Sequence, residues 1–386
     1  MCGILGVAGE KTAPWGLRAA PVMLASMAHR GPDGKGLWAD REGDCVLAHN
    51  RLAIIDPQNG TQPLANEDAT VWITFNGCIY NYVELRRELE SGGHRFHTRC
   101  DTEVIVHAYE EWGTRCVSRF NGMWAFAIWD VRERTLFCSR DRIGIKPFYY
   151  TWEPGRFVFA SEIKAIIASG AVAGRADADG LRQYLSFQLC LADTTLFDGI
   201  KKLEPGCNLI LAKGKSPRIE RYWDISFELD ESSTEGEFVE QIAELIEDSV
   251  RLRLRSDVPL GAHLSGGLDS STVVMTASRL LGGEFKTFTG SFNEGRDYDE
   301  TEYARIASKA AGPATSRCGS HLRISPLRLK KSSTTWTSRP PVRACSRNTS
   351  SQSWLPKTSR WSSGGRGAMR FSSVTRGTWL LISRNA

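Results

Sequence analysis

Short apolar runs alternate with polar segments along the first part of the chain. Residues 71–75 and 123–129 are rich in β-branched or aromatic side chains and are bounded by Asn-Gly or Asp, which predicts buried strands. The dipeptides Asn76-Gly77 and Asn121-Gly122 are typical of turns. We therefore expect compact strands separated by tight turns in this region.

Two neighbouring segments have the spacing of amphipathic helices. Residues 82–91 alternate Val or Leu with Glu or Arg at helical spacing and end at Gly92-Gly93, a helix stop. Residues 102–112 place their apolar side chains on one face, with Asp101 as the expected N-cap. Together with the strands, these helices predict an α+β domain over residues 1–212.

A different pattern follows. Residues 204–236 mix Pro, Gly, Lys and Ser, which predicts a strand pair and then a connector at residues 213–236. The order helix, strand, glycine loop, helix, strand, helix is typical of an α/β nucleotide-binding domain, which we place at residues 237–312. Its elements are predicted at residues 238–254, 258–264, 265–271 (the loop), 272–281, 285–292 and 300–311.

The last part of the chain has a different composition. Glu302 is the last acidic residue, and the 84 residues that follow it contain 16 Lys or Arg. From about residue 313 Ser, Arg, Thr and Trp dominate, with neither a helical nor a strand period. We therefore expect residues 313–386 to be a disordered basic tail.

Length and cysteine content restrict the class of protein. No run reaches the roughly 18 apolar residues that a membrane span requires, and Met1-Cys2-Gly3 does not open a secretory signal. The ten cysteines include no CxxC pair, so they indicate neither a disulfide framework nor a zinc site. We expect a cytoplasmic protein with no membrane partner.

Cys2 is the first candidate for catalysis. Removal of Met1 would leave its thiol beside a free α-amine, whose pKa of about 8 lets it act as a base towards the thiol. A thiolate formed in this way can attack an amide carbon without a separate histidine. For Cys2 taken alone, an accidental and inert cysteine is the commoner case.

The neighbours of Cys2 change that balance, because six motifs occur in one order: Cys2–Ile4, His29–Gly34, Asn50–Asp56, Asn76–Asn81, Asp101–Glu103 and Ser139–Arg142. The first 200 residues or so therefore resemble the class II glutamine amidotransferases, whose N-terminal nucleophile domain hydrolyses glutamine. The resemblance implies Cys2 as nucleophile, with the Asn76 side chain and the Gly77 N–H as oxyanion hole. It implies that Arg51 clamps the glutamine α-carboxylate and that Asp101 takes its α-ammonium. The implied glutamine-binding residues are Arg51, Leu52, Ala53, Ile54, Ile55, Asn76, Gly77, Cys78 and Asp101.

Cys78 departs from the family pattern, in which Glu usually occupies this position and helps to hold the substrate ammonium. A thiol cannot supply that charge. Loss of a charge-assisted hydrogen bond is worth roughly 1.5–3 kcal/mol. Weakened glutamine binding and a tolerated substitution, with Asp101 sufficient alone, remain equal alternatives.

A glycine loop opens the second domain. Ser265-Gly266-Gly267-Leu268-Asp269-Ser270 lies between a predicted strand and a predicted helix, where backbone N–H groups and the helix N-terminus attract an anion. It lacks the GK[ST] of a Walker loop and resembles the PP-loop of ATP pyrophosphatases. That resemblance implies Mg²⁺ at Asp269, and ATP bound by Leu264, Ser265, Gly266, Gly267, Asp269, Ser270, Ser271 and Gly290.

The two halves in this order resemble the glutamine-hydrolysing asparagine synthetases, up to about Gly312. The implied architecture is a four-layer αββα N-terminal nucleophile domain followed by a truncated α/β PP-loop domain of the adenine nucleotide α-hydrolase type. The implied substrates are glutamine, aspartate and ATP, with Mg²⁺, and the family relationship also allows a homodimer. In such enzymes aspartate is adenylated and ammonia from the glutaminase site displaces AMP.

Residues after about 312 do not continue this resemblance. Residues 361–370 have the glycine density of an expected GxGxDE motif but lack its acids, so we hypothesise a shift of reading frame near residues 312–320. The chain would then be a glutaminase-only or inactive remnant. An amidotransferase for another carboxylate acceptor stays open, because the acceptor pocket belongs to the missing part. A basic tail that binds nucleic acid is a weaker alternative, since its charges are not clustered.

Overall fold

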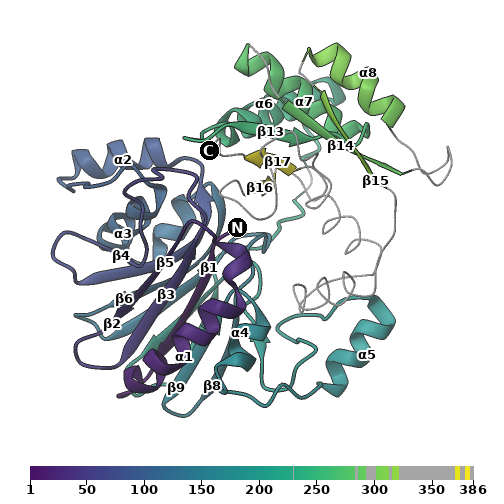
Figure 1. The fold of residues 1–386 in the computed structure, drawn as a ribbon. Coiled ribbons are helices and arrows are strands. Elements are labelled where there is room, and N and C mark those ends of the chain that lie inside the picture. The colour runs from purple at the N-terminus through teal and green to yellow at the C-terminus, as the bar shows by residue number, and fades with distance from the viewer. Residues whose placement is uncertain are drawn as a thin grey trace. The chain divides into compact units, whose positions relative to one another are not determined.

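The structure is a computed structural model that describes residues 1–228, 230–282, 286–289 and 301–312, together with the backbone of residues 290–292 and of strands at 315–320, 370–373 and 379–382 (Figure 1). It divides into two compact units, Met1–Ile225 and a second that begins at Ser226. We describe each unit by itself. Among the described residues no helix has the length and apolar character needed to cross a membrane.

Two six-stranded sheets form the centre of the first unit. The first sheet has the order β10-β8-β9-β1-β3-β2, and its strands pair antiparallel. The second has the order β12-β11-β7-β6-β5-β4 and is also antiparallel. Their strands are β1 (Gly3–Ala8), β2 (Gly34–Ala39), β3 (Cys45–Arg51), β4 (Leu64–Ala65), β5 (Val71–Ile79), β6 (Gly122–Asp130), β7 (Thr135–Arg140), β8 (Tyr149–Glu153), β9 (Arg156–Ala160), β10 (Lys201–Lys202), β11 (Cys207–Ala212) and β12 (Arg218–Arg221).

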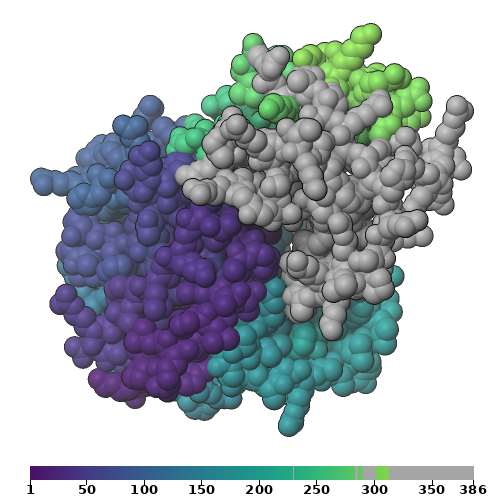
Figure 2. Space-filling view, in the orientation of Figure 1, coloured from purple at the N-terminus to yellow at the C-terminus, as the bar shows by residue number. Residues whose placement is uncertain are grey.

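Helices cover the outer face of each sheet. The helices α1 (Ala13–Ser26) and α4 (Ile163–Ala168) pack on the first sheet, while α2 (Tyr82–Ser91) and α3 (Asp101–Trp112) pack on the second (Figure 1). A further helix, α5 (Ala178–Phe187), precedes β10, and short 3₁₀ helices lie at Ala28–Arg30 and Gly113–Arg119. The layer order is helix, sheet, sheet, helix, which confirms the αββα prediction. In Figure 2 the N-terminal residues, in purple, form a closely packed surface.

Strand β6 shows how the sequence dictates these layers. Its side chains are buried on both faces. Trp124, Phe126 and Ile128 pack in the cluster formed with α2 and α3. Ala125 and Ala127 pack between the two sheets. Because successive side chains of a strand point to opposite faces, an almost continuous apolar run is what a strand in a four-layer core requires.

Three local predictions need correction or extension. Asn76-Gly77 is not a turn, because β5 continues through it to Ile79 and pairs with β6 as far as Gly122. The helix predicted from residue 102 begins at Asp101, with Cys100 at its N-cap. Strand β12 pairs with β11 beyond residue 212, so the first unit includes the strand pair that the sequence predicts before its connector.

The second unit begins with helix α6 (Glu235–Arg253), closed at its start by a capping box between Thr234 and Glu237. Strand β13 (Leu260–His263), helix α7 (Leu268–Leu281), strand β14 (Lys286–Phe292) and helix α8 (Thr301–Ala311) follow. β13 and β14 pair parallel, as a strand–helix–strand unit requires. Val250, Ala262, Leu264 and Val274 are among its buried core residues. This arrangement confirms the α/β class of the second domain.

The predicted disordered tail at residues 313–386 lies largely outside the described residues. Within it the structure describes β15 (Thr315–Ser320), which pairs parallel with β14, and β16 (Arg370–Ser373) and β17 (Trp379–Ile382). β17 also pairs antiparallel with β13. The domain boundaries and the character of the tail therefore stay predictions.

Candidate functional site

Cys2 lies immediately before β1, an interior strand of the first sheet. Its thiol is half-buried, and the Leu52 N–H donates a hydrogen bond to Sγ at 3.3 Å. The thiol in turn faces the Leu52 carbonyl oxygen at 3.6 Å, and Arg30 Nε donates to the Cys2 carbonyl oxygen at 2.8 Å. These contacts fix the backbone of Cys2 and bring the segment after β3 against its sulfur.

Arg30 belongs to a buried ion-pair network. Its Nη1 donates to Glu162 Oε1 at 2.9 Å, and His29 Nε2 lies at 2.9 Å from the same oxygen. Burial alone would raise the pKa of Glu162, but the bonds with His29 and Arg30 outweigh it and lower that pKa to about 2. Glu162 is therefore ionised and holds Arg30 against the backbone of Cys2.

Lys146 is a buried cation near two thiols. Burial, the largest cause, and the positive charge of Arg30 together lower the pKa of its ammonium to about 8, against the opposing charges of Asp141, Cys78 and Cys2. Asp141 orders the loop that carries Lys146 by accepting from the N–H groups of Ile145 (2.8 Å) and Lys146 (2.9 Å). Lys146 is thus within electrostatic range of both Cys2 and Cys78.

The predicted oxyanion-hole residues lie in the second half of β5. Asn76 is buried, and its Nδ2 has no hydrogen-bond partner within the part of the chain that the structure describes. Gly77 faces Trp124 across the ladder, and a Cβ there would lie only 2.2 Å from the Met123 carbonyl oxygen. The neighbouring backbone therefore requires glycine at position 77, and a buried amide donor stands beside it.

Asp101 begins α3 and is buried beside β5. The Ile79 N–H donates to Asp101 Oδ2 at 2.9 Å. Burial raises the pKa of this carboxyl to about 6, and hydrogen bonds from Ile79, from the first turn of α3 and from the Cys78 side chain oppose the shift. The structure therefore brings Cys78, the position that departs from the family pattern, into contact with Asp101.

Arg51 ends β3 and is held by the loop that follows. Its Nη2 donates to the Asp56 carbonyl oxygen at 2.6 Å and its Nη1 to the Pro57 carbonyl oxygen at 2.8 Å. These bonds fix the plane of the guanidinium. In the same segment Leu52, Ala53 and Ile55 are buried and Ile54 is half-buried.

The glycine loop of the second unit joins β13 to α7. The Ser265 and Ser270 hydroxyl oxygens are 3.0 Å apart, the Gly267 N–H donates to Ser265 Oγ, and Ser270 Oγ donates to the Gly267 carbonyl oxygen. Thr289 Oγ1 donates to the Leu264 carbonyl oxygen at 2.9 Å, which ties β14 to the start of the loop. The loop is therefore folded on itself at the end of β13.

Residues predicted to bind ATP and Mg²⁺ lie together in this loop and in the first turn of α7. The helix starts at Leu268 rather than at the predicted residue 272, so Asp269, Ser270 and Ser271 belong to its first turn. Asp269 and Ser265 are exposed. An exposed carboxylate beside glycine N–H groups and hydroxyls has the donor chemistry that Mg²⁺ and phosphates require. Gly290 lies in the middle of β14, opposite Cys318 of β15.

The sequence pattern gave no role to Arg30, Lys146 or Glu162. Arg30 lies in the motif His29–Gly34, whereas Lys146 and Glu162 lie outside the six motifs, and the roles of all three depend on contacts between distant parts of the chain. The histidine and glutamate side chains around α3 were also missed. Their signal was His107 and Glu110 three residues apart on a predicted helix.

Comparison with known proteins gives two family matches. Residues 1–223 match the glutamine amidotransferase domain family, and residues 241–317 match the asparagine synthase family. The first match covers more than half of the chain.

Several curated proteins are similar over most of this chain. Asparagine synthetase [glutamine-hydrolyzing] 1 of Bacillus subtilis is 37% identical over 318 residues, which are 81% of this chain and 49% of that protein. The putative asparagine synthetase [glutamine-hydrolyzing] 2 of Methanocaldococcus jannaschii is 36% identical over 79% of this chain and 62% of that protein. The Zea mays asparagine synthetase [glutamine-hydrolyzing] is 38% identical over 73% of this chain and 42% of that protein. The chain spans about half the length of the relatives it matches.

Among solved structures, a glutamine phosphoribosylpyrophosphate amidotransferase from B. subtilis, complexed with ADP and GMP, matches with a TM-score of 0.44 and 18% identity. The match covers 90% of this chain and 70% of that chain.

Proposed function

The chain belongs to the glutamine amidotransferase domain family, and from this premise we propose that it takes part in glutamine-dependent synthesis of asparagine. Its first unit would hydrolyse glutamine at Cys2, and its second would activate aspartate with ATP. The observation that carries the proposal is the environment of Cys2, whose sulfur accepts the Leu52 N–H at 3.3 Å. The asparagine synthase family match over residues 241–317 supports the second half of the proposal.

In the proposed glutaminase step the free α-amine of Cys2 takes the proton of its own thiol. The thiolate attacks the carboxamide carbon of glutamine, a C–S bond forms, and the carbonyl oxygen becomes an oxyanion. The amide nitrogen takes the proton from the α-ammonium and leaves as ammonia. Water then cleaves the thioester, which releases glutamate and restores the thiol. Lys146 is a buried cation within electrostatic range of Cys2.

Two donors would stabilise the oxyanion. Asn76 Nδ2 is a buried amide with no hydrogen-bond partner among the described residues, which suits a group that bonds only to the reaction intermediate. The Gly77 N–H would be the second donor. A preorganised donor requires no rearrangement when the charge develops, and for this reason such groups contribute strongly to rate.

The glutamine backbone would be held by opposite charges. Arg51 presents a guanidinium whose plane is fixed by Asp56 and Pro57, and a bidentate bond to a carboxylate suits that geometry. The Asp101 carboxylate would accept a hydrogen bond from the α-ammonium. Cys78, in contact with Asp101, contributes no negative charge, so a single carboxylate would carry this interaction.

In the proposed second step the β-carboxylate of aspartate attacks the α-phosphorus of ATP and pyrophosphate leaves. Ammonia then displaces AMP to give asparagine. Ser265, Ser270, Ser271 and the glycine N–H groups would hold the phosphates, Leu264 and Gly290 would lie beside the adenosine, and Asp269 would hold Mg²⁺. When bound, the cation would offset the negative charge of the phosphates. A reducing cytoplasm stays the expected compartment, and a homodimer stays a prediction.

Two readouts test the two halves separately. Purified protein is incubated with glutamine alone while glutamate is followed, and with aspartate, ATP and Mg²⁺ while pyrophosphate is followed. Cys2→Ala should abolish glutamate release and leave pyrophosphate release unchanged, whereas Asp269→Asn should do the reverse. Glutamate release that survives in Cys2→Ala contradicts the first half. Mass spectrometry of the mature N-terminus is the control, because a retained Met1 would block the α-amine of Cys2.

A glutaminase without synthetase activity is the second candidate, and one observation favours it. The asparagine synthase match ends at residue 317, close to where acidic residues cease. Glutamate release without pyrophosphate release supports this candidate, and the absence of both supports an inactive remnant. An amidotransferase for another carboxylate acceptor would release pyrophosphate only with that acceptor.

A further inference from the structure

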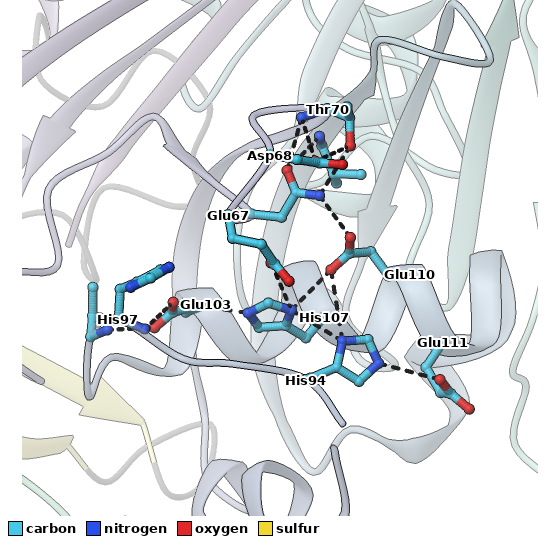
Figure 3. Close-up of polar contacts among 12 residues, drawn as sticks. Glu67, Asp68, Thr70, His94, His97, Glu103, His107, Glu110 and Glu111 are labelled. Carbon is cyan, nitrogen blue, oxygen red and sulfur yellow. Dashed lines mark hydrogen bonds and ion pairs between the residues drawn. The ribbon is translucent and has the colours of Figure 1, made fainter. Parts of the chain in front are cut away.

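A second group of ionisable side chains lies on the outer face of the first unit, apart from the residues assigned to glutamine. His94 is in the segment between α2 and α3, while His107 and Glu110 lie one turn apart on α3 (Figure 3). His107 is fully buried and His94 is half-buried. One ligand atom from each of the three side chains lies within 4.8 Å of the other two.

The inner atoms of this group converge on one point. His94 Nδ1 is 3.3 Å from His107 Nδ1, and His107 Nδ1 is 2.9 Å from Glu110 Oε2. The third side of the triangle, from His94 Nδ1 to Glu110 Oε2, is 3.9 Å. Metal–ligand bonds of about 2.0–2.1 Å separate neighbouring ligands of a tetrahedral zinc ion by about 3.3 Å. The three atoms already have nearly that spacing.

Further polar groups face the outer atoms of the same side chains. His94 Nε2 is 3.2 Å from Glu111 Oε2, and His107 Nε2 is 3.9 Å from Glu103 Oε1 (Figure 3). Glu110 Oε1 accepts a hydrogen bond from Asn66 Nδ2 at 2.7 Å. Metal-binding histidines usually have a carboxylate or carbonyl on the nitrogen that faces away from the metal, which sets the tautomer and orientation of the ring. His94 has that arrangement, whereas His107 Nε2 faces Glu103 at 3.9 Å without a hydrogen-bond partner among the described residues.

A proton is the other cation that this group could hold. Burial lowers the pKa of His107, but the carboxylates of Glu103, Glu110 and Glu67 outweigh it and raise that pKa to about 9. A hydrogen on His107 Nδ1 would satisfy Glu110. His94 Nδ1 at 3.3 Å and Glu67 Oε2 at 3.9 Å face the same nitrogen and would compete for that hydrogen. One N–H can be shared between two acceptors, whereas a zinc-class ion takes four ligands at once.

We propose that His94, His107 and Glu110 bind one divalent transition-metal ion of the zinc class, through Nδ1, Nδ1 and Oε2. Glu67 is the protein carboxylate placed for the fourth position. Two imidazoles select zinc, cobalt or nickel over magnesium and calcium, which prefer oxygen ligands throughout.

Such an ion would fasten the segment around His94 to α3. That segment is already held at its other end by Glu103, which accepts from the His97 and Thr98 N–H groups at 2.7 Å each. The site is therefore structural in character, because it joins a loop to the helix that begins at Asp101. The inference rests on the geometry around α3 and holds whether or not the first unit hydrolyses glutamine.

The test uses the full chain after treatment with a chelator. Titration calorimetry with Zn²⁺ and visible absorption with Co²⁺ should show one tightly bound ion per chain, with a Co²⁺ spectrum of tetrahedral type. His94→Gln and Glu110→Gln should each weaken binding by at least about 100-fold. His97→Gln is the matched control, because its exposed side chain comes from the same segment and its backbone N–H alone contacts Glu103. It should bind like the unmodified protein.

Each binding result either supports or overturns the metal site at His94, His107 and Glu110. Loss of binding in His94→Gln and Glu110→Gln, with binding kept in His97→Gln, supports the site. A chain that binds no ion in the unmodified form overturns it. Equal binding by His94→Gln and His97→Gln also overturns it, since the ion would then lie elsewhere, for example on a thiol. Circular dichroism confirms folding of each variant, and the two substituted ligands provide independent tests should one variant unfold.

Discussion

At the scale of single residues, the buried amide of Asn76 gives the sharpest prediction. Its Nδ2 has no hydrogen-bond partner among the described residues, so Asn76→Ala removes no hydrogen bond that this donor makes to them. In the proposed mechanism it removes a donor to the oxyanion, which should lower kcat for glutamine hydrolysis by about 100- to 1000-fold with little change in KM. Steady-state kinetics and the midpoint of thermal unfolding measure the two effects. A loss of rate that parallels a loss of stability would contradict the role.

Cys78 provides the complementary test, because a carboxylate can be restored there. The thiol contacts Asp101, so Cys78→Glu would place a second negative charge where the glutamine ammonium is proposed to bind. We expect KM for glutamine to fall by about tenfold, in line with a charge-assisted hydrogen bond. Cys78→Gln has nearly the same shape without the charge and is the matched control. Equal KM values for the two variants would show that the charge is not used.

The raised pKa of Asp101 predicts that glutamine binding depends on pH. Burial raises the pKa of this carboxyl to about 6, so it loses its charge as the pH falls through that value. The ammonium of glutamine stays charged, and KM should therefore rise towards about tenfold per pH unit below pH 6. The expected measurement is kcat/KM between pH 4.5 and 8.

Protonation of Asp101 should affect folding stability in the opposite direction: it weakens glutamine binding but stabilises the folded state. The native state binds the Asp101 proton more tightly than the unfolded state, whose carboxyl has a pKa near 3.8. The cost of burying the charge is fully present above pH 6 and is relieved as the pH falls towards 4. In Asp101→Asn both effects should vanish, with a KM that is high at every pH. A KM that rises below pH 6 in this variant too would assign the titration to another group.

At the scale of the secondary-structure elements, Gly266 shows how the glycine loop depends on backbone shape. Its φ is +88°, and a Cβ would lie 2.6 Å from the Ala304 N and from the Tyr303 Cβ of α8. Gly266→Ala should lower the free energy of unfolding of the second unit by about 1–3 kcal/mol. Gly282→Ala is the matched control, because φ there is +61° and no atom of the described residues lies within 4 Å of the position of its Cβ. Denaturant titration should show a smaller loss for the control.

Helices and strands were predicted correctly where the sequence pattern within a single segment was strong. Residues 82–91 form α2 as predicted, because their amphipathic spacing and the following glycines act within a single segment. Asn76-Gly77 was predicted as a turn and lies within β5, because pairing with β6 overrides the turn preference of the dipeptide. The αββα layers were predictable only through the family resemblance, since sheet order is set by contacts between distant segments.

Site residues within local motifs could likewise be predicted from the sequence, whereas those whose roles depend on distant contacts could not. The contact between Cys2 and Leu52 joins two motifs that the sequence places 50 residues apart, and each motif was recognisable by itself. The roles of Lys146 and Glu162 were not recognisable, because burial and neighbouring charges give them their character. Asp269, Ser270 and Ser271 were expected in the loop before the helix and lie in the first turn of α7, because the helix begins four residues earlier than expected. Ligand binding at these positions stays a prediction.

At the scale of the whole molecule, the chain combines two units of unequal extent. The first contains complete sheets covered by helices on both outer faces, and its family match runs through residues 1–223. Over the residues that the structure describes, the second has a smaller core, and its family match covers residues 241–317. If the two units fold separately, selective unfolding by denaturant should destroy pyrophosphate release at a lower concentration than glutamate release.

The composition of the last 84 residues leads to a prediction about the gene rather than the protein. At the acid frequency of the first 302 residues, which hold 44 Asp or Glu, a stretch of this length should contain about 12 acids, and it contains none. Out-of-frame translation of a GC-rich sequence yields Arg, Ser, Thr and Trp in place of acids, which matches the observed residues. Reading the other two frames from the codons of residues 312–320 should therefore restore acidic residues and a GxGxDE motif after an apolar run. If neither alternative frame remains open or contains that motif, the tail is an authentic basic segment, and its retention on DNA at increasing salt becomes the relevant measurement.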